Sequence, residues 1–182
     1  MAEVIELDDI DALGTGSVGE PGQRAFYIQA RTEDAQLTVL VEKEQVALLA
    51  REAVAFLDRI ADDYPEIPIA VSDTEAQLRE PTVPLFRARL IGLGFDPERE
   101  LVLIELRERS ADEDDDAEDE PGPSASAPED ADPGYVARIY ATRAQVRAMA
   151  ARGADAVQGG RPPCPLCEQP MDPAGHHCPR WN

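Results

Sequence analysis

The chain has 182 residues and a mass of 19.8 kDa, which fits one ordinary domain with appendages. Its 37 acidic and 17 basic side chains give a formal net charge of -20, which disfavours nucleic acid and anionic membranes as partners. No apolar run approaches the roughly 20 residues that a membrane-spanning helix needs, and the first residues lack the features of a signal peptide. We therefore expect a cytoplasmic protein.

The first half of the chain predicts a β-hairpin followed by a helix. Two apolar runs, residues 25–30 and 37–41, flank a polar turn, as the strands of a hairpin do. From Glu42 onwards apolar residues recur at steps of three and four, which is the period of one helix face. The pair Tyr64-Pro65 then ends this helix, because proline cannot continue it.

Two further segments of the first half carry weaker signals. Residues 14–19 have the spacing of a glycine-rich phosphate loop, but they precede a strand instead of opening a helix, so we interpret them as a hairpin or loop. Residues 73–80 have the composition of a short helix capped by Ser72 or Asp73.

The second half predicts the same kinds of element. Residues 86–95 and 101–106 form two strands around a turn at residues 96–99. A further strand follows at residues 135–140, and a helix carries the apolar positions between Val146 and Val157.

An acidic insert separates two of these strands. Residues 110–134 contain 11 acidic side chains, no basic ones and four prolines, a composition that buries too little apolar surface to order itself. We predict a disordered insert in a hairpin loop. Its charge favours a solvated loop over an interaction tail or a mimic of nucleic acid, and it lacks the alternating acids and central glycine of a calcium-binding EF-hand loop.

The two halves align with each other, which indicates an internal duplication. An offset of 100 residues matches Lys43 with Arg143 and Gln45 with Gln145, whereas upstream an offset of 76 matches Ile28 with Ile104, Gly16 with Gly92 and Pro21 with Pro97. The difference of 24 residues is close to the length of the insert. The sequence predicts one α+β domain over residues 1–160, built from pseudo-repeats at about 1–64 and 85–160. Each repeat is a strand-strand-strand-helix unit, which gives about six strands and two main helices.

The last 22 residues, 161–182, form a tail that contains all three cysteines and both histidines of the chain. Cys164 and Cys167 are separated by two residues, so that a tight turn aims both sulfurs at one point. His176 and Cys178 then complete a Cys3His set, with His177 as the alternative nitrogen ligand. The tail therefore predicts a zinc knuckle.

This zinc site is expected to be structural. Four protein ligands leave no position for water or substrate, and a segment so short has no core of its own, so the metal supplies much of its folding energy. Redox chemistry of the cysteine pair and inert reduced thiols are the competing interpretations, whereas a disulfide is disfavoured in a reducing cytoplasm.

The knuckle and several other short motifs resemble an actinobacterial family of about 180–200 residues that carries a domain of unknown function. The resemblance rests on Cys164-Pro165-Leu166-Cys167, on residues 171–176 and 178–182, on Gln45-Val46, and on residues 93–96. Glu168 departs from the glycine that the family carries at that position. The resemblance implies a gene that lies near those for a phosphatase-like protein, a lipid-kinase-like protein and a thiol-pathway ligase. It supplies no catalytic residues.

Two functional hypotheses follow. The favoured one is a non-enzymatic adaptor with a zinc knuckle, in which Arg180 and Trp181 anchor a protein partner. The alternative is an enzyme or ligand-binding accessory for a phosphorylated or thiol metabolite, with Arg87, Arg89 and Arg138 as an anion-binding face. More often, such arginines pair with local carboxylates on a solvated face.

Overall fold

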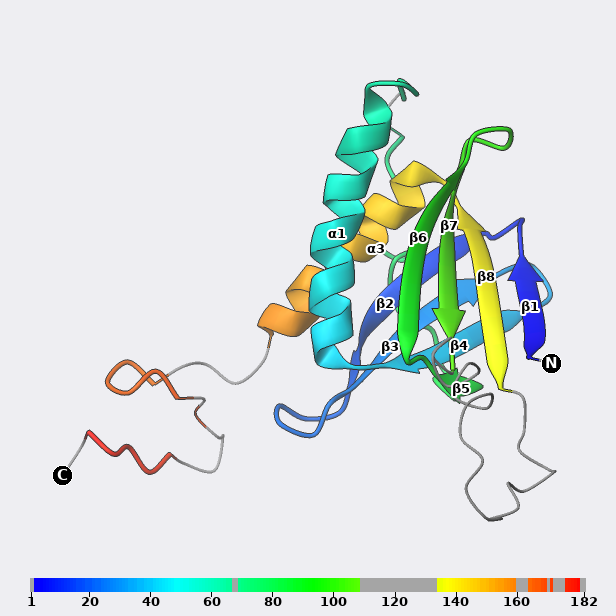
Figure 1. The fold of residues 1–182 in the computed structure, drawn as a ribbon. Helices are drawn as coiled ribbons and strands as arrows, with labels where there is room; N and C mark the ends of the chain where they lie inside the picture. The colour runs from blue at the N-terminus through cyan, green and yellow to red at the C-terminus, as the bar shows by residue number, and fades with distance from the viewer. Residues whose placement is uncertain are drawn as a thin grey trace, which may run out of the picture.

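The computed structural model describes residues 2–66, 69–108, 134–159, 164–169, 171 and 176–180. These residues form two four-stranded sheets and two long helices, which confirms the α+β class (Figure 1). The first half contains β1 (Glu3–Leu7), β2 (Ala12–Val18), β3 (Ala25–Arg31), β4 (Gln36–Val41) and α1 (Lys43–Ala61). The second half contains β5 (Phe86–Arg87), β6 (Leu90–Asp96), β7 (Leu101–Arg107), β8 (Tyr135–Ala141) and α3 (Arg143–Gln158).

Each sheet combines three antiparallel strands of one half with one strand of the other half. The first sheet has the order β2-β3-β4-β5, and the second sheet has the order β6-β7-β8-β1. The exchanged strands, β5 and β1, run parallel to β4 and β8 respectively. Both halves therefore have the same topology, as the predicted duplication requires, and each has one more strand than predicted.

The strand register corrects one detail of the internal alignment. Ile28 lies opposite Thr15, and its counterpart Ile104 lies opposite Leu93, so β2 and β6 are related by 78 residues. The predicted offset of 76 is right for β3 and β7 but wrong by two for β2 and β6, because the loop that follows β2 is longer by two residues. Two pairs of glycines correspond as a result: Gly14 with Gly92, and Gly16 with Gly94.

Of the predicted alternatives for residues 14–19, a hairpin or a loop, the structure has the hairpin: most of this segment belongs to β2, which pairs antiparallel with β3. Its glycines are needed where another part of the chain comes close. A Cβ atom on Gly14 would lie 2.6 Å from the carbonyl oxygen of Gln77, which is far inside van der Waals contact. The glycine spacing thus serves backbone packing and not a phosphate.

The predicted strand at residues 86–95 is two strands in different sheets. The amide of Ala88 donates to Leu40 O in the first sheet (2.9 Å), whereas the amide of Arg89 donates to Arg107 O in the second sheet (2.7 Å). The chain therefore crosses between the sheets at these two residues, which a pattern of alternating side chains does not reveal.

Both helices begin with matching caps. Gln45 and Gln145 each stand at the third helical position and complete a capping box. Each glutamine also donates to a residue that follows the exchanged strand, Gln45 to Arg89 O (3.0 Å) and Gln145 to Ile10 O (3.0 Å). The caps therefore tie each helix to the segment that enters from the other half.

The core lies between the two sheets and the inner faces of α1 and α3. Side chains of β3, β4, β7 and β8 that point inward are nearly all fully buried, and they join the apolar faces of both helices in one cluster. The helices approach closely at Gly153, where a Cβ atom would lie 3.1 Å from Val46 and 3.3 Å from Thr15.

The segment of residues 72–82, here called the covering segment, is not the predicted helix. It makes a turn at Ser72, whose carbonyl accepts from the amide of Glu75 (2.9 Å), and then crosses the first sheet on the side away from the core. The side chains of Gln29 and Arg31 bind several of its carbonyl oxygens. These bonds replace the helical ones that the sequence predicts.

The rest of the predicted organisation is partly outside the described residues. Residues 109–133, which include nearly all of the predicted acidic insert, lie there. The division into a domain of residues 1–160 and a tail of residues 161–182 remains a prediction. Among the residues described, no helix has the length and apolar character needed to cross a membrane.

Candidate metal centre

The tail begins with a tight turn that places two cysteines side by side. The amide of Glu168 donates to Cys164 O (2.8 Å), and the amide of Cys164 donates to Gln169 O (2.8 Å). These bonds close a loop around Pro165 and Leu166. Glu168 ends the loop with a φ of 63°, the left-handed region that glycine adopts most easily. Glu168 therefore stands at a position whose backbone favours glycine, the residue that the resemblance implies there.

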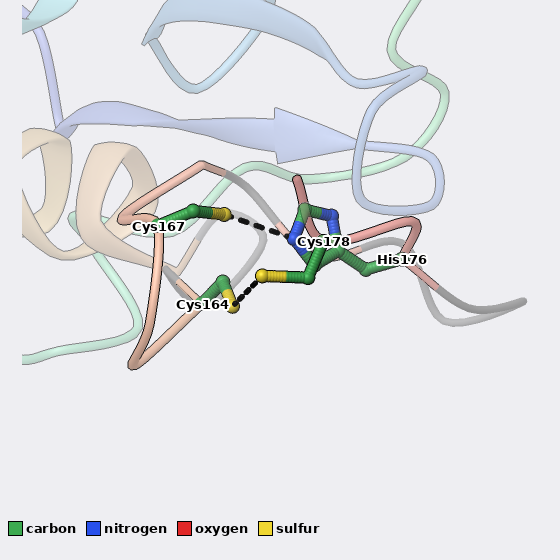
Figure 2. Close-up of side chains that lie close together, drawn as sticks. All are labelled: Cys164, Cys167, His176 and Cys178. Atoms are coloured by element: carbon green, nitrogen blue, oxygen red, sulfur yellow. Dashed lines mark hydrogen bonds between the residues drawn. The ribbon is translucent and has the colours of Figure 1, made fainter. Parts of the chain in front are cut away.

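Three cysteines and one histidine converge at this turn, as Figure 2 shows. The Sγ atoms of Cys164 and Cys178 lie 3.8 Å apart, and Cys167 Sγ lies 3.1 Å from His176 Nε2. All four ligand atoms lie within 4.8 Å of one another. Cys164 and Cys178 are buried, and all three cysteines are free thiols.

The separation of Cys164 and Cys178 matches that of two thiolates on one tetrahedral metal ion. With zinc-sulfur bonds of about 2.3 Å, two thiolates of a tetrahedral site lie about 3.8 Å apart, which is the separation of Cys164 and Cys178. Sulfur and imidazole ligands select zinc over the oxygen-preferring magnesium and calcium ions. The four residues could thus hold a metal ion, and their number would leave it no open position.

The turn also prepares one thiol for metal binding. The backbone amides of Leu166 and Cys167 donate to Cys164 Sγ and lower the pKa of that thiol to about 6. Burial has the opposite effect on Cys167, whose pKa is raised. Because zinc binds the thiolate, the low pKa of Cys164 means that one ligand is available near neutral pH without displacing a proton.

The two histidines occupy different environments. His176 is half-buried and belongs to the cluster, whereas His177 is exposed and does not. Of the predicted partner anchors, Arg180 is exposed and donates from Nη1 to Leu166 O (3.2 Å), beside the cysteine turn. Trp181 lies outside the described residues.

The three arginines of the predicted anion-binding face are not brought together. Arg87 lies in the first sheet and pairs with Glu42 (3.2 Å). Arg138 lies in the second sheet and pairs with Glu105 (2.9 Å), and Arg89 is at the crossing between the two sheets. This placement removes the shared face on which the anion-site hypothesis depended.

A second cluster escaped the sequence analysis. Glu105 accepts from Arg107 Nε (2.7 Å) and from Arg138 Nε (2.9 Å) on the outer face of the second sheet. Burial alone would raise the pKa of Glu105, but the bonds from Arg138 and Arg107 outweigh it, and the pKa lies below the usual carboxyl value. The offset of 76 relates Glu105 to Gln29 and Arg107 to Arg31. This correspondence is the sequence signal that could have identified the cluster.

Comparison with known proteins adds a family but no activity. No curated protein and no solved structure matches the sequence. One family model does match: it is described as a protein of unknown function (DUF3090), and it spans residues 5–178. That span runs from β1 to the last cysteine of the cluster, so both halves and all four candidate ligands lie inside it. The chain therefore belongs to the DUF3090 family, as its resemblance to a family of unknown function had indicated.

Proposed function

We propose that Cys164, Cys167, His176 and Cys178 hold a structural zinc ion, and that the folded tail is the protein-interaction module of a non-enzymatic adaptor. One observation carries the metal assignment: four soft ligand atoms lie within 4.8 Å of one another. Because a site with four protein ligands has no position for substrate or an activated water, the metal shapes the tail and does no chemistry.

Cobalt substitution tests the closed, tetrahedral character of the site. Cobalt(II) in a tetrahedral thiolate site absorbs strongly in the visible range and gives a sulfur-to-metal charge-transfer band. We expect one equivalent of cobalt to produce both features and one equivalent of zinc to remove them. Excess imidazole should leave the cobalt spectrum unchanged, because no coordination position is open; a shifted spectrum would show an open site and would contradict a structural role.

The surface around the cysteine turn supports the interaction part of the proposal. Leu166 lies at the tip of the turn and is 49% exposed, and Arg180 lies next to it. An apolar side chain beside an arginine, both held by a rigid metal-bound turn, is the kind of anchor that protein interfaces use. The side chains of the ligands face inward, so this surface can be altered without touching the metal.

Affinity capture from the native host, followed by mass spectrometry, tests this surface. A Leu166→Asp variant should keep its zinc and lose the specific proteins that the intact chain captures. Leu48→Asp is the matched control, because Leu48 is equally exposed at 52% but lies on α1. If both variants capture the same proteins as the intact chain, the cysteine turn is not the interaction surface.

A further inference from the structure

The outer faces of the two sheets, which are related by the internal duplication, differ in what covers them. The outer face of the first sheet lies under the covering segment, and Gln29 there is fully buried at 0% exposure. On the second sheet, Glu105 occupies the corresponding position and its side chain is 20% exposed, while those of Arg107 and Arg138 are each 39% exposed. Figure 1 shows β6, β7 and β8 in front of the first sheet with no described segment across them.

Side chains of the first sheet bind the covering segment mainly through the backbone atoms of that segment. Gln29 donates to Arg79 O (2.9 Å) and accepts from the amide of Arg79 (2.8 Å). Arg31 donates from Nη1 both to Gln29 Oε1 (2.9 Å) and to Gln77 O (2.8 Å). Its Nη2 reaches Glu75 O (3.2 Å), so a single arginine binds two carbonyls of the turn and bend at residues 73–77.

The glycines of β2 complete this arrangement. The backbone of Gln77 fills the space over Gly14, and the side chain of Leu78 lies over Gly16, 3.3 Å from where a Cβ atom would stand. At the edge of the sheet, the amide of Thr15 donates to Ala76 O (3.2 Å). The covering segment thus lies partly on the strand and partly along its edge.

The second sheet has the corresponding positions, and no segment among the described residues lies over them. Glu105 and Arg107 stand where the first sheet has Gln29 and Arg31, and Arg107 Nε bonds Glu105 as Arg31 bonds Gln29. Gly92 and Gly94 stand at the glycine positions of the duplicated strand. A Cβ atom on either would meet only a cross-strand neighbour, Glu105 at 3.9 Å or Leu103 at 3.6 Å.

We propose that this face of the second sheet binds a peptide segment of a partner protein. The Nη groups of Arg107 bind the carbonyls of the peptide, as those of Arg31 do in the first sheet. An apolar side chain of about leucine size lies over Gly94, as Leu78 lies over Gly16. The amide of Leu93, which matches Thr15 in register, adds an edge bond of the kind made in strand addition.

The described part of the chain after α3 does not repeat the covering segment that follows α1. After α1 the chain supplies the covering segment, with Ala76 and Leu78 in contact with β2. The helices α1 and α3 start 100 residues apart. The same offset relates Ala76 to His176 and Leu78 to Cys178. Since these two belong to the Cys/His cluster, the second half uses its own covering residues elsewhere. This argument needs the cluster but not the identity of its metal, so the inference goes beyond the proposed function.

A phage-displayed library of random 12-residue peptides tests the proposal on the zinc-loaded, full-length chain. We expect enriched peptides to carry a small residue followed two positions later by leucine, isoleucine or methionine, as Ala76 and Leu78 do in the covering segment. A synthetic copy of an enriched peptide should bind the intact chain, and Gly94→Val and Arg107→Ala should each weaken its binding at least about tenfold. Arg147→Ala, which removes an exposed arginine from α3, should leave binding unchanged.

The outcomes separate this proposal from its rivals. Absence of enrichment, or enriched peptides whose binding is the same in the Gly94→Val and Arg107→Ala variants, would overturn it. A dimer in light scattering that Gly94→Val dissociates would show that a second copy occupies the face, and would overturn it as well. A Cys164→Ser chain should still bind the peptide, so a failure of the zinc proposal remains distinguishable from a failure of this one.

Discussion

Glu168 has a backbone conformation that its side chain opposes. A φ of 63° costs a residue with a Cβ atom about 1 kcal/mol relative to glycine. Because the turn must form for Cys164 and Cys167 to converge, that cost lowers the affinity for metal. We expect Glu168→Gly to bind zinc about fivefold more tightly, measured by competition with a chromogenic chelator.

Glu168→Ala is the control for this change. It removes the negative charge near the thiolates but keeps the Cβ atom. An alanine variant that gains as much affinity as the glycine variant would show that charge, and not backbone conformation, limits binding at this position.

Two equivalent glycines should respond differently to the same substitution. A Cβ atom on Gly14 would clash with Gln77 O at 2.6 Å, whereas one on Gly92 would meet Glu105 Cβ at an ordinary 3.9 Å. We expect Gly14→Ala to lower the free energy of unfolding by about 2 kcal/mol and Gly92→Ala to change it by less than about 0.5 kcal/mol, in urea titrations. Equal effects would mean that the covering segment does not lie against β2.

At the scale of elements, the covering segment depends on one buried side chain of β3. Gln29 is fully buried, and each of its polar atoms has a partner on Thr38, Arg79 or Arg31. Replacing it removes these bonds and leaves the buried Thr38 hydroxyl without the one from Gln29, so we expect Gln29→Leu to lower the free energy of unfolding by about 3 kcal/mol. Gln36→Leu on β4 is the control, since Gln36 also bonds the covering segment but is exposed, and it should cost less than about 1 kcal/mol.

The arginine pair on β7 and β8 makes stability depend on the charge of Glu105. The pKa of Glu105 is lower in the folded chain than its ordinary value of 4.5, so its contribution is present above that value and is lost as the pH falls through the folded pKa. We expect Glu105→Gln to destabilise the chain at about pH 7 and to have a much smaller effect at about pH 3. Urea titrations of both chains at the two pH values measure this, and a difference that does not depend on pH would contradict it.

For the whole molecule, the sequence predicted the helices and strands that hydrophobic periodicity determines. The two long helices and the strands at residues 25–31, 101–107 and 135–141 follow from periodicity, because each buries one face against the core. The exchange of β1 and β5 between the halves did not follow, since each pairs with a strand far away in sequence and β5 has only two residues. The sequence analysis did not decide between a hairpin strand and a loop for β2, because its glycines are typical of turns. In the structure, the close approach of the covering segment requires them.

The metal cluster was predictable because its geometry is set by spacing within one short segment. Cys164 and Cys167 share a turn, and His176 and Cys178 return to it. The arginine-glutamate cluster around Glu105 depends instead on the register between β7 and β8, which are separated by the long insert. No spacing in the sequence gives that register directly.

Metal removal should affect the tail and the domain of sheets and helices differently. The sheets and helices have their own core, whereas the proposed function makes the tail depend on its metal. We expect a chelator to abolish hydrogen-exchange protection in residues 164–169 and 176–180 and to leave the strands of both sheets protected. A loss of protection in β3 or β7 on metal removal would show that the tail stabilises the domain, contrary to this account.

The two adjacent histidines allow the most direct test of the central claim, a closed Cys3His zinc site. Zinc content should be measured on His176→Ala and His177→Ala chains after dialysis against a chelator that the intact chain resists. The account predicts one zinc per chain for the intact protein and for His177→Ala, and loss of zinc from His176→Ala. Retention of zinc by His176→Ala, or its loss from His177→Ala, would contradict the assignment of the four ligands.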